Sequence, residues 1–267
     1  MTALIVLSAV SVVSIDKAQA AESPMQFIKE FTQEKLQKTK KIKIENWHWS
    51  KKAVDQPIKE TKNFTIEKKK TKTHLEQVEE AVDFASKKTG VRKDFLMGML
   101  VVESDLGRST GDCSYKEVEE GAEAAYQNGQ LGYQAYNTFI QRREIIKNLA
   151  ESIGRDYEKV RVSCNPTRYA GTGGAMGIPQ FMPDIWMLYK DKISEIVEKE
   201  NPDPWNVKDG IVAMALLLSD TYGVKQHDHL AERNAAKMYL SGTTSGQYDW
   251  YANQIQYWSK NYKRLLG

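Results

Sequence analysis

The sequence predicts a mostly α-helical domain, and three observations support this fold class. From His74 onward, apolar residues recur at three- and four-residue spacing, which places them on one face of a helix. Glycines follow several of these segments, as is common after the last residue of a helix. No run of alternating apolar and polar residues indicates a sheet. With 267 residues, of which 41% are hydrophobic, the chain can form one such domain and an extension.

The first 20 residues are predicted to be a signal peptide. Ala3 to Ile15 is apolar and has about the length of a signal core, although no Lys or Arg precedes it. Ala18-Gln19-Ala20 then supplies a small-x-small cleavage pattern. We therefore expect an exported protein of the periplasm or cell-wall space. The apolar run is too short to span a bilayer, so we expect no stable membrane span.

Residues 21–73 are predicted to be an extension or linker, partly disordered. Residues 21–40 are polar and compatible with a helix, whereas residues 41–73 are rich in Lys and Thr and lack sustained apolar periodicity. Its basic run, Lys62 to Lys72, is interpreted as a solvated linker, with contact to an anionic polymer as the alternative. The formal net charge of +3 is too small to favour nucleic acid as a partner.

Residues 74–267 are predicted to form the helical domain. Its first helix begins near His74 and is ended by Gly90. The second runs from about Arg92 to Ser104, and Gly107 marks the stop. Gly171 to Gly177 holds four glycines and is predicted to be a loop, after which Pro179 suits the first turn of a helix. Gly223 is expected to end a later apolar helix. The remaining helical segments are 115–154, 179–189, 211–218, 230–240 and 250–265.

Cys113 and Cys164 are the two cysteines of the chain. An even count in an exported protein favours one disulfide, and two free buried thiols are the alternative. A bridge across this 51-residue separation would stabilise the fold by roughly 4 kcal/mol. Two cysteines and four scattered histidines show no ligand spacing, so we expect no metal site.

Glu103 is the strongest candidate for a catalytic group. It follows Leu96 and Met99 on one helix face, where loss of hydration favours the neutral carboxyl group. It also lies in the last turn of its helix, where the macrodipole disfavours negative charge. Both effects raise the pKa, as a general acid near neutral pH requires. The alternative is a Glu103 that turns to solvent or pairs with a base such as Arg108.

A second catalytic carboxylate is not evident in the sequence. Asp105 is two residues further on and would point elsewhere on a helix. A two-carboxylate hydrolase needs a nucleophile or a base that activates water. A lone glutamate fits another route, in which the acid protonates the leaving oxygen and then takes a proton from a hydroxyl of the same sugar. The product would be an internal anhydro ring.

Two motifs in this order resemble the lytic transglycosylases of peptidoglycan. They are Glu103-Ser104 followed by Leu106-Gly107, and Gly-Ala-Met-Gly-x-x-Gln-Phe-Met-Pro at 174–183. The long interval between them resembles the broader membrane-bound type B and phage-like subgroups more than the shortest soluble form, and the type B-like subgroup is the most similar. The resemblance implies a lysozyme-like helical domain that cleaves the β-1,4 bond between N-acetylmuramic acid and N-acetylglucosamine. It implies 1,6-anhydromuramoyl ends, glycan strands as the partner and no cofactor.

The resemblance also implies roles for individual residues. Glu103 would be the acid and base, and Ser104 would support the polar groups of the reacting sugar. Met176 and Gln180 belong to the motif that lines the glycan groove. Tyr239 lies in a looser signature at 236–242, and Tyr251 resembles the tyrosine that hydrogen-bonds the catalytic glutamate.

Two other functions compete with this interpretation. One is a water-using muramidase of the goose type, which would produce reducing ends. The other is a noncatalytic glycan-binding scaffold that retains the fold. The intact Glu103 and the intact 174–183 motif argue against a scaffold.

Overall fold

The computed structural model describes residues 72–165 and 173–266. The chain divides into two units, 1–67 and 68–267, and all described residues belong to the second. The predicted signal peptide, and the predicted linker up to residue 71, lie outside the described residues.

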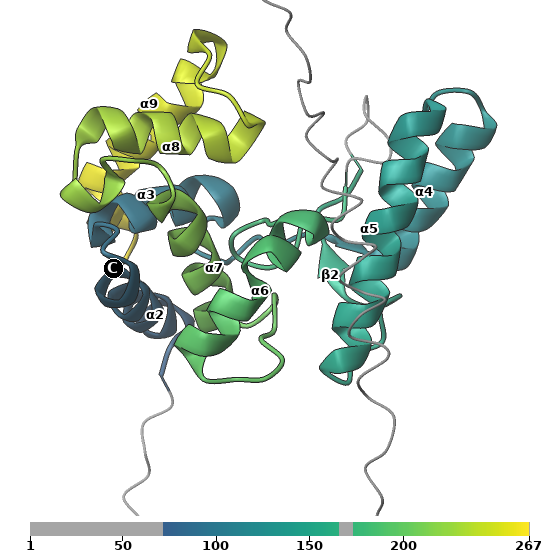
Figure 1. Cartoon of the computed structure of the whole chain (residues 1–267), viewed down its shortest axis with the longest axis horizontal. Helices are drawn as coiled ribbons and strands as arrows, with labels where there is room; N and C mark the ends of the chain where they lie inside the picture. The colour runs from purple at the N-terminus through teal and green to yellow at the C-terminus, as the bar shows by residue number, and fades with distance from the viewer. Residues whose placement is uncertain (1–71, 166–172, 267) are drawn as a thin grey trace, which may run out of the picture. The chain divides into compact units, whose positions relative to one another are not determined.

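The prediction of a mostly α-helical fold is confirmed. Within the described residues there are eight α-helices, three short 3-10 helices and two strands of two residues each. The helices are α2 (His74–Thr89), α3 (Lys93–Ser104), α4 (Tyr115–Gln127), α5 (Tyr133–Ser152), α6 (Pro183–Val197), α7 (Val207–Ser219), α8 (His229–Ser241) and α9 (Asp249–Asn261) (Figure 1). None of the helices described is long and apolar enough to cross a membrane.

Local signals set both ends of α2. The Thr73 hydroxyl accepts a hydrogen bond from the Glu76 amide (3.2 Å), and the Glu76 carboxylate accepts one from the Thr73 amide (2.6 Å). This reciprocal pair is a capping box. At the other end Gly90 adopts a φ of 79°, and its amide donates to the Ser86 carbonyl. Glycine takes this left-handed conformation without steric cost, so the predicted helix end is confirmed.

Helix α3 lies in the core of the domain. Nearly every residue from Phe95 to Leu100 is fully buried, in keeping with a helix that is apolar on all sides. Its main neighbour is α9, and α2 packs chiefly against α7. Helix α3 is therefore held on several sides, which fixes the position of Glu103 in its last turn.

Gly98 marks the closest approach of α3 to α9. A Cβ atom at this position would lie 2.4 Å from the Ser259 hydroxyl oxygen and 2.6 Å from the Ile255 carbonyl oxygen. Real Cβ atoms do not approach other atoms so closely, so a larger side chain would force the helices apart. The missing side chain thus permits the packing of α9 on α3.

Gly98→Ala is therefore expected to lower the free energy of unfolding by about 1–3 kcal/mol, the usual cost of overpacking. Urea denaturation followed by circular dichroism would measure the change. The control is Gly132→Ala, because a Cβ at Gly132 meets no atom within 4 Å. Equal stability of the two variants would contradict the close approach of α3 and α9.

The prediction that a helix begins near Pro179 is wrong. Helix α6 begins at Pro183, which occupies its first turn. Met176 and Phe181 form a backbone bridge, with Met176 N donating to Phe181 O at 2.8 Å and Phe181 N to Met176 O at 3.2 Å. Pro179 lies inside this closed turn and cannot start a helix. A proline does occupy the first turn of this helix, but it is Pro183 and not Pro179.

Helix α7 contains the predicted segment 211–218, but Gly223 does not mark its end. Its last residue is Ser219, whereas the expected stop was Gly223. Gly223 has a φ of 94° and precedes the 3-10 helix Val224–Gln226. A Cβ at Gly223 would lie 2.7 Å from the Ala231 side chain, so this glycine serves the approach of α8.

Helices α4 and α5 lie side by side and form the segment between the two cysteines (Figure 1). Strands β1 (Cys113–Ser114) and β2 (Arg161–Val162) pair antiparallel at the base of this segment, with Cys113 opposite Val162. Cys113 and Cys164 are joined by a disulfide, with Cα atoms 5.1 Å apart. The predicted bridge is confirmed.

Candidate active site

Glu103 stands where the chain turns sharply out of α3. Asp105 and Leu106 both adopt left-handed conformations, with φ of 49° and 57°. Their amides donate to carbonyl groups of the last helical turn, from Asp105 to Val101 (3.1 Å) and from Leu106 to Leu100 (3.0 Å). This reversal ends the helix directly after Ser104 and leaves Glu103 partly exposed at its edge.

The hydrogen-bond partner of Glu103 comes from α9. The Tyr251 hydroxyl donates to the Glu103 carboxyl oxygen Oε1. Arg108, the base considered as an alternative partner, instead donates two hydrogen bonds of 2.9 Å to Asp105. Asp105 is exposed and ion-paired, as expected for a residue that points away from the site. Glu103 is thus held by a neutral phenol.

Burial raises the pKa of Glu103 from its ordinary value of 4.5 to about 7. The hydrogen bond from Tyr251 acts in the opposite direction and lowers the pKa, because it stabilises the ionised carboxylate. In the described part of the chain, no charged side chain contributes to the shift. The result is a carboxyl group that retains its proton near neutral pH and still reaches solvent.

This raised pKa makes stability depend on pH in a defined direction. Well below pH 4.5 the carboxyl group is protonated in both the folded and the unfolded chain. As pH rises towards 7 the unfolded chain releases the proton first, so Glu103 progressively destabilises the fold. Glu103→Gln cannot ionise and should therefore be more stable than the wild type at pH 8, by about 1–3 kcal/mol. Denaturant titrations at pH 4 and pH 8 would measure the difference.

Asp105→Asn is the matched control, because its effect on stability at pH 8 should have the opposite sign. The Arg108 hydrogen bonds lower the pKa of Asp105, so its charge stabilises the folded chain above the ordinary pKa. Neutralising Asp105 should remove stability at pH 8. A Glu103→Gln variant that is destabilised at pH 8 as well would contradict the burial of the Glu103 carboxyl group.

Tyr239 links Glu103 to the glycine-rich turn. Its hydroxyl donates to the Pro179 carbonyl, and its ring lies 5.6 Å from the Phe181 ring, centroid to centroid. The pKa of Tyr239 is raised well above 10 by burial and by the nearby Glu103 and Tyr251. Two neutral tyrosines from α8 and α9 therefore flank the carboxyl group.

The start of the glycine-rich turn pairs with the chain just after β2, as a neighbouring strand would. Ser163 both donates and accepts a backbone hydrogen bond there: its amide donates to the Ala175 carbonyl, and its carbonyl accepts from the Gly174 amide, both at 2.9 Å. Gly177 has a φ of 60°, and a Cβ there would lie 2.0 Å from the Pro204 carbonyl oxygen. Only glycine satisfies both constraints.

Gln180 is the residue of this turn whose side chain is partly exposed to solvent. Residues 173–179 and 181 are buried, whereas Gln180 is partly exposed and has a φ of 52°. Its amide nitrogen donates to the carbonyl oxygens of Thr110 (3.0 Å) and Gly177 (2.8 Å). Gln180 therefore ties the turn to the segment that follows α3.

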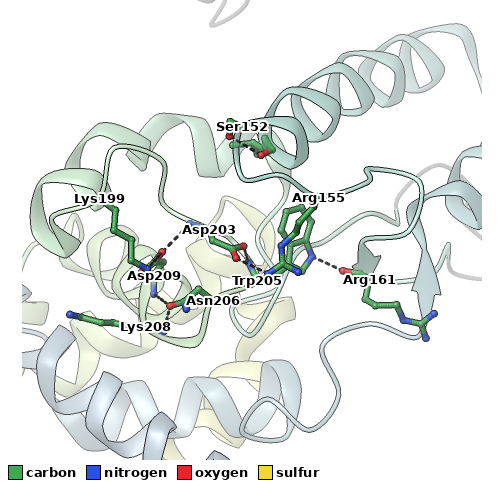
Figure 2. A network of polar contacts seen from close by, with 10 residues as sticks. Ser152, Arg155, Arg161, Lys199, Asp203, Trp205, Asn206, Lys208 and Asp209 are labelled. Atoms are coloured by element: carbon green, nitrogen blue, oxygen red, sulfur yellow. Dashed lines mark hydrogen bonds and ion pairs between the residues drawn. The ribbon is translucent and has the colours of Figure 1, made fainter. Parts of the chain in front are cut away.

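A polar network supports the loop around Pro204, which packs against Gly177 (Figure 2). At its centre, fully buried Asp209 accepts two hydrogen bonds from Lys199 (2.8 Å each) and one from the Asp203 amide (2.9 Å). Arg155 pairs with Asp203 at 2.7 Å, and the Trp205 indole donates to a backbone carbonyl of β2 at 2.7 Å. The network fastens the loop before α7 to the segment between α5 and β2.

Three of the predicted substrate-binding residues are buried: Ser104, Met176 and Tyr251. The Ser104 hydroxyl accepts a hydrogen bond from the Gly107 amide (3.1 Å) and donates one to the Leu100 carbonyl (3.4 Å), so it closes the helix end. Met176 packs in the core below the turn. The structure thus places these three behind the site, while Gln180 and Tyr239 are partly exposed.

An ion pair behind the tyrosines was not predicted from the sequence. Buried Lys237 donates to Asp249 at 2.9 Å, joining α8 to the start of α9. Each partner lies two residues before a tyrosine of the site, Tyr239 or Tyr251. The pair fixes the two helix ends against each other. Because it joins two separate helices, no local sequence pattern marks it.

Other features of the described residues do not belong to this site. A pocket of about 280 Å³ is lined by residues of α2 and of the start of α7, and Glu103 is not among them. Among residues 72–165 and 173–266, no group of three His, Cys, Asp or Glu side chains is placed to hold a metal ion.

Comparisons with known proteins point to one family. The model of the family described as "Transglycosylase SLT domain" matches residues 10–261. No curated protein matches the sequence. Among solved structures, a 36 kDa muramidase/transglycosylase is 22% identical with a TM-score of 0.42, and the match covers 56% of this chain and 43% of the other.

Two structures of the Escherichia coli lytic transglycosylase Slt35 are also similar. The complex with calcium is 21% identical with a TM-score of 0.42, and the match covers 56% of this chain and 42% of that one. The complex with bulgecin A is 16% identical with a TM-score of 0.49, and the match covers 70% of both chains. The chain thus spans less than half the length of the first two structures.

Proposed function

Because this chain belongs to the transglycosylase SLT domain family, we propose that it is a lytic transglycosylase of peptidoglycan. Its reaction would cleave the β-1,4 bond between N-acetylmuramic acid and N-acetylglucosamine without water. The observation that carries the proposal is the state of Glu103. This carboxyl group has a pKa of about 7, is hydrogen-bonded by a neutral tyrosine and is partly open to solvent.

In the first step the neutral carboxyl group of Glu103 donates its proton to the glycosidic oxygen. The bond between that oxygen and C1 of the muramic acid residue breaks, and N-acetylglucosamine leaves with the proton. Positive charge develops at C1, where the carbonyl oxygen of the sugar's own N-acetyl group stabilises it. A pKa near the working pH favours this proton transfer.

In the second step the Glu103 carboxylate takes a proton from the C6 hydroxyl of the same sugar. The C6 oxygen then bonds to C1 and closes the 1,6-anhydro ring, which returns Glu103 to its neutral form. The hydrogen bond from Tyr251 supports this step because it stabilises the transient carboxylate. The scheme requires one carboxyl group, in accord with an Asp105 that is engaged by Arg108.

The other residues of the site form two groups, one partly exposed and one buried. Gln180 and the ring of Tyr239 are proposed to contact the sugars, since both side chains are partly exposed beside the turn, whereas the Tyr239 hydroxyl is bonded to the Pro179 carbonyl. Ser104, Met176 and Tyr251 are proposed to hold Glu103 and the turn in place from behind. No cofactor takes part in the proposed reaction.

The proposed place of action is outside the cytoplasm. The Cys113–Cys164 disulfide supports this location, because such bonds persist in oxidising compartments. We propose residues 1–20 as the export signal, 21–73 as a linker and 74–267 as the domain that acts on the cell wall.

Mass spectrometry of the soluble products from purified sacculi tests the proposed reaction. We expect muropeptides with 1,6-anhydro ends, which are lighter by one water than hydrolysis products. Reducing ends instead would identify a water-using muramidase. Binding to sacculi without product release would identify a noncatalytic scaffold. Either of these results would contradict the proposal.

A further inference from the structure

Helix α9 carries two exposed aromatic side chains outside the site described above. Trp250 is 55% exposed and Tyr257 is 52% exposed. They are seven residues apart, so they point in nearly the same direction from the helix, about 10.5 Å apart along its axis. Trp250 and Tyr257 thus present two large aromatic side chains on one exposed face of α9.

The residues between and beyond them share this face. Asn253, Gln254 and Lys260 are exposed at the helical spacing that continues the face. Asn253 accepts a hydrogen bond from Arg233 of α8, which leaves its amide N–H groups directed elsewhere. We call Trp250, Asn253, Gln254, Tyr257 and Lys260 the α9 stripe. It contains aromatic, amide and cationic groups, and the carboxylate of Asp249, four residues before Asn253, is ion-paired with Lys237 and Arg233.

We propose that the α9 stripe is a second binding site for a β-1,4-linked glycan strand, separate from the catalytic site; this inference rests on the proposed function. The C–H groups on one face of a pyranose ring can pack against an aromatic ring. The amides of Asn253 and Gln254 would hydrogen-bond hydroxyl and N-acetyl groups. The two side chains leave the helix about 10.5 Å apart along its axis, which is close to the length of one disaccharide in such a strand.

One end of the stripe lies next to Tyr251, a buried residue of the candidate active site. The Trp250 ring contacts the Tyr251 ring edge-on, with centroids 5.7 Å apart, and Tyr251 donates to Glu103. Charge also favours this occupant, since Lys260 would attract the carboxylates of the peptides attached to the glycan. A protein partner is less suited, because polar amides interrupt the face and leave no continuous apolar patch.

The stripe should therefore strengthen the binding of long glycan strands and not of short ones. A strand held along α9 would stay near Glu103 between successive cuts, which lowers the KM for polymeric substrate. A short oligosaccharide that occupies only the catalytic site gains nothing from the stripe. Substitutions in the stripe are thus expected to raise the KM for sacculi and to leave kcat unchanged.

Binding to purified sacculi by the full-length protein carrying Glu103→Gln tests the proposal without turnover. Adding Trp250→Ala and Tyr257→Ala together should weaken binding about tenfold, in line with the loss of two aromatic contacts. Trp250→Phe retains a ring and should keep most of the affinity. Tyr222→Ala and Tyr133→Ala are matched controls, because these tyrosines are 94% and 67% exposed but lie outside the stripe.

Each result decides the proposal in one direction. Unchanged binding of the double variant, or an equal loss in the two controls, would overturn it. Binding to glycan from which an amidase has removed the peptides should persist, and its loss would show that peptides are the ligand and would also overturn it. Wild-type protein that releases no anhydro products but binds through the stripe would refute the proposed reaction alone.

Discussion

Glu103→Gln is expected to reduce the release of soluble muropeptides from sacculi by about 10²- to 10⁴-fold, the usual contribution of a general acid. Glutamine has nearly the same shape and can still accept the hydrogen bond from Tyr251. It cannot donate a proton to the leaving oxygen, so the bond-breaking step loses its acid. The fold should be retained, with the gain in stability at alkaline pH described above.

The control for this prediction is Asp105→Asn. Asp105 lies two residues from Glu103, but it is exposed and paired with Arg108. Its neutralisation should leave the cleavage rate within a few-fold of the wild type. A folded Glu103→Gln protein with wild-type activity would remove Glu103 from the reaction, and with it the proposed mechanism.

The largest expected effect on stability comes from breaking the Cys113–Cys164 disulfide. The bond closes a loop across 51 residues, and its loss should lower the free energy of unfolding by roughly 4 kcal/mol. Most domains are stable by only about 5–15 kcal/mol, so this is a large part of the total. Denaturant titration of oxidised protein and of Cys113→Ser/Cys164→Ser protein would measure it.

Loss of the disulfide should also affect the glycine-rich turn at 174–183. Cys164 follows Ser163, the residue whose backbone holds Gly174 and Ala175. The double variant is therefore expected to lose cleavage activity at temperatures where it is still folded. Thiol titration of denatured, unreduced wild type should find no free thiol. Two free thiols, or a double variant as stable as the wild type, would contradict the role of the bridge.

Much of the helical fold was predictable because its signals are local. The apolar spacing from His74, the glycine that ends α2 and the apolar run of α3 each act within a few residues. The start of α6 was not predictable in this way. Pro179 and Pro183 carry the same local preference, and the choice between them depends on the bridge between Met176 and Phe181.

For the candidate site, the residue types were evident but their orientation was not. The sequence pointed to Glu103 through its apolar face and helix end, and to Tyr251 and Gln180 through a resemblance. It did not distinguish the exposed Gln180 from the buried Met176 of the same motif. In a tight turn the side-chain directions follow from backbone conformation, here a positive φ at Gln180, and not from spacing.

The sequence by itself therefore determined a helical protein with a lone glutamate at a helix end and a glycine-rich turn, because short-range periodicity and glycine conformation encode these features. Only the tertiary structure decided which groups surround Glu103. Tyr251 and Tyr239 come from helices more than a hundred residues away along the chain, and the Lys237–Asp249 pair joins those two helices. The convergence of the two tyrosines on one carboxyl group depends on how α8 and α9 pack against α3, which is a property of the whole core.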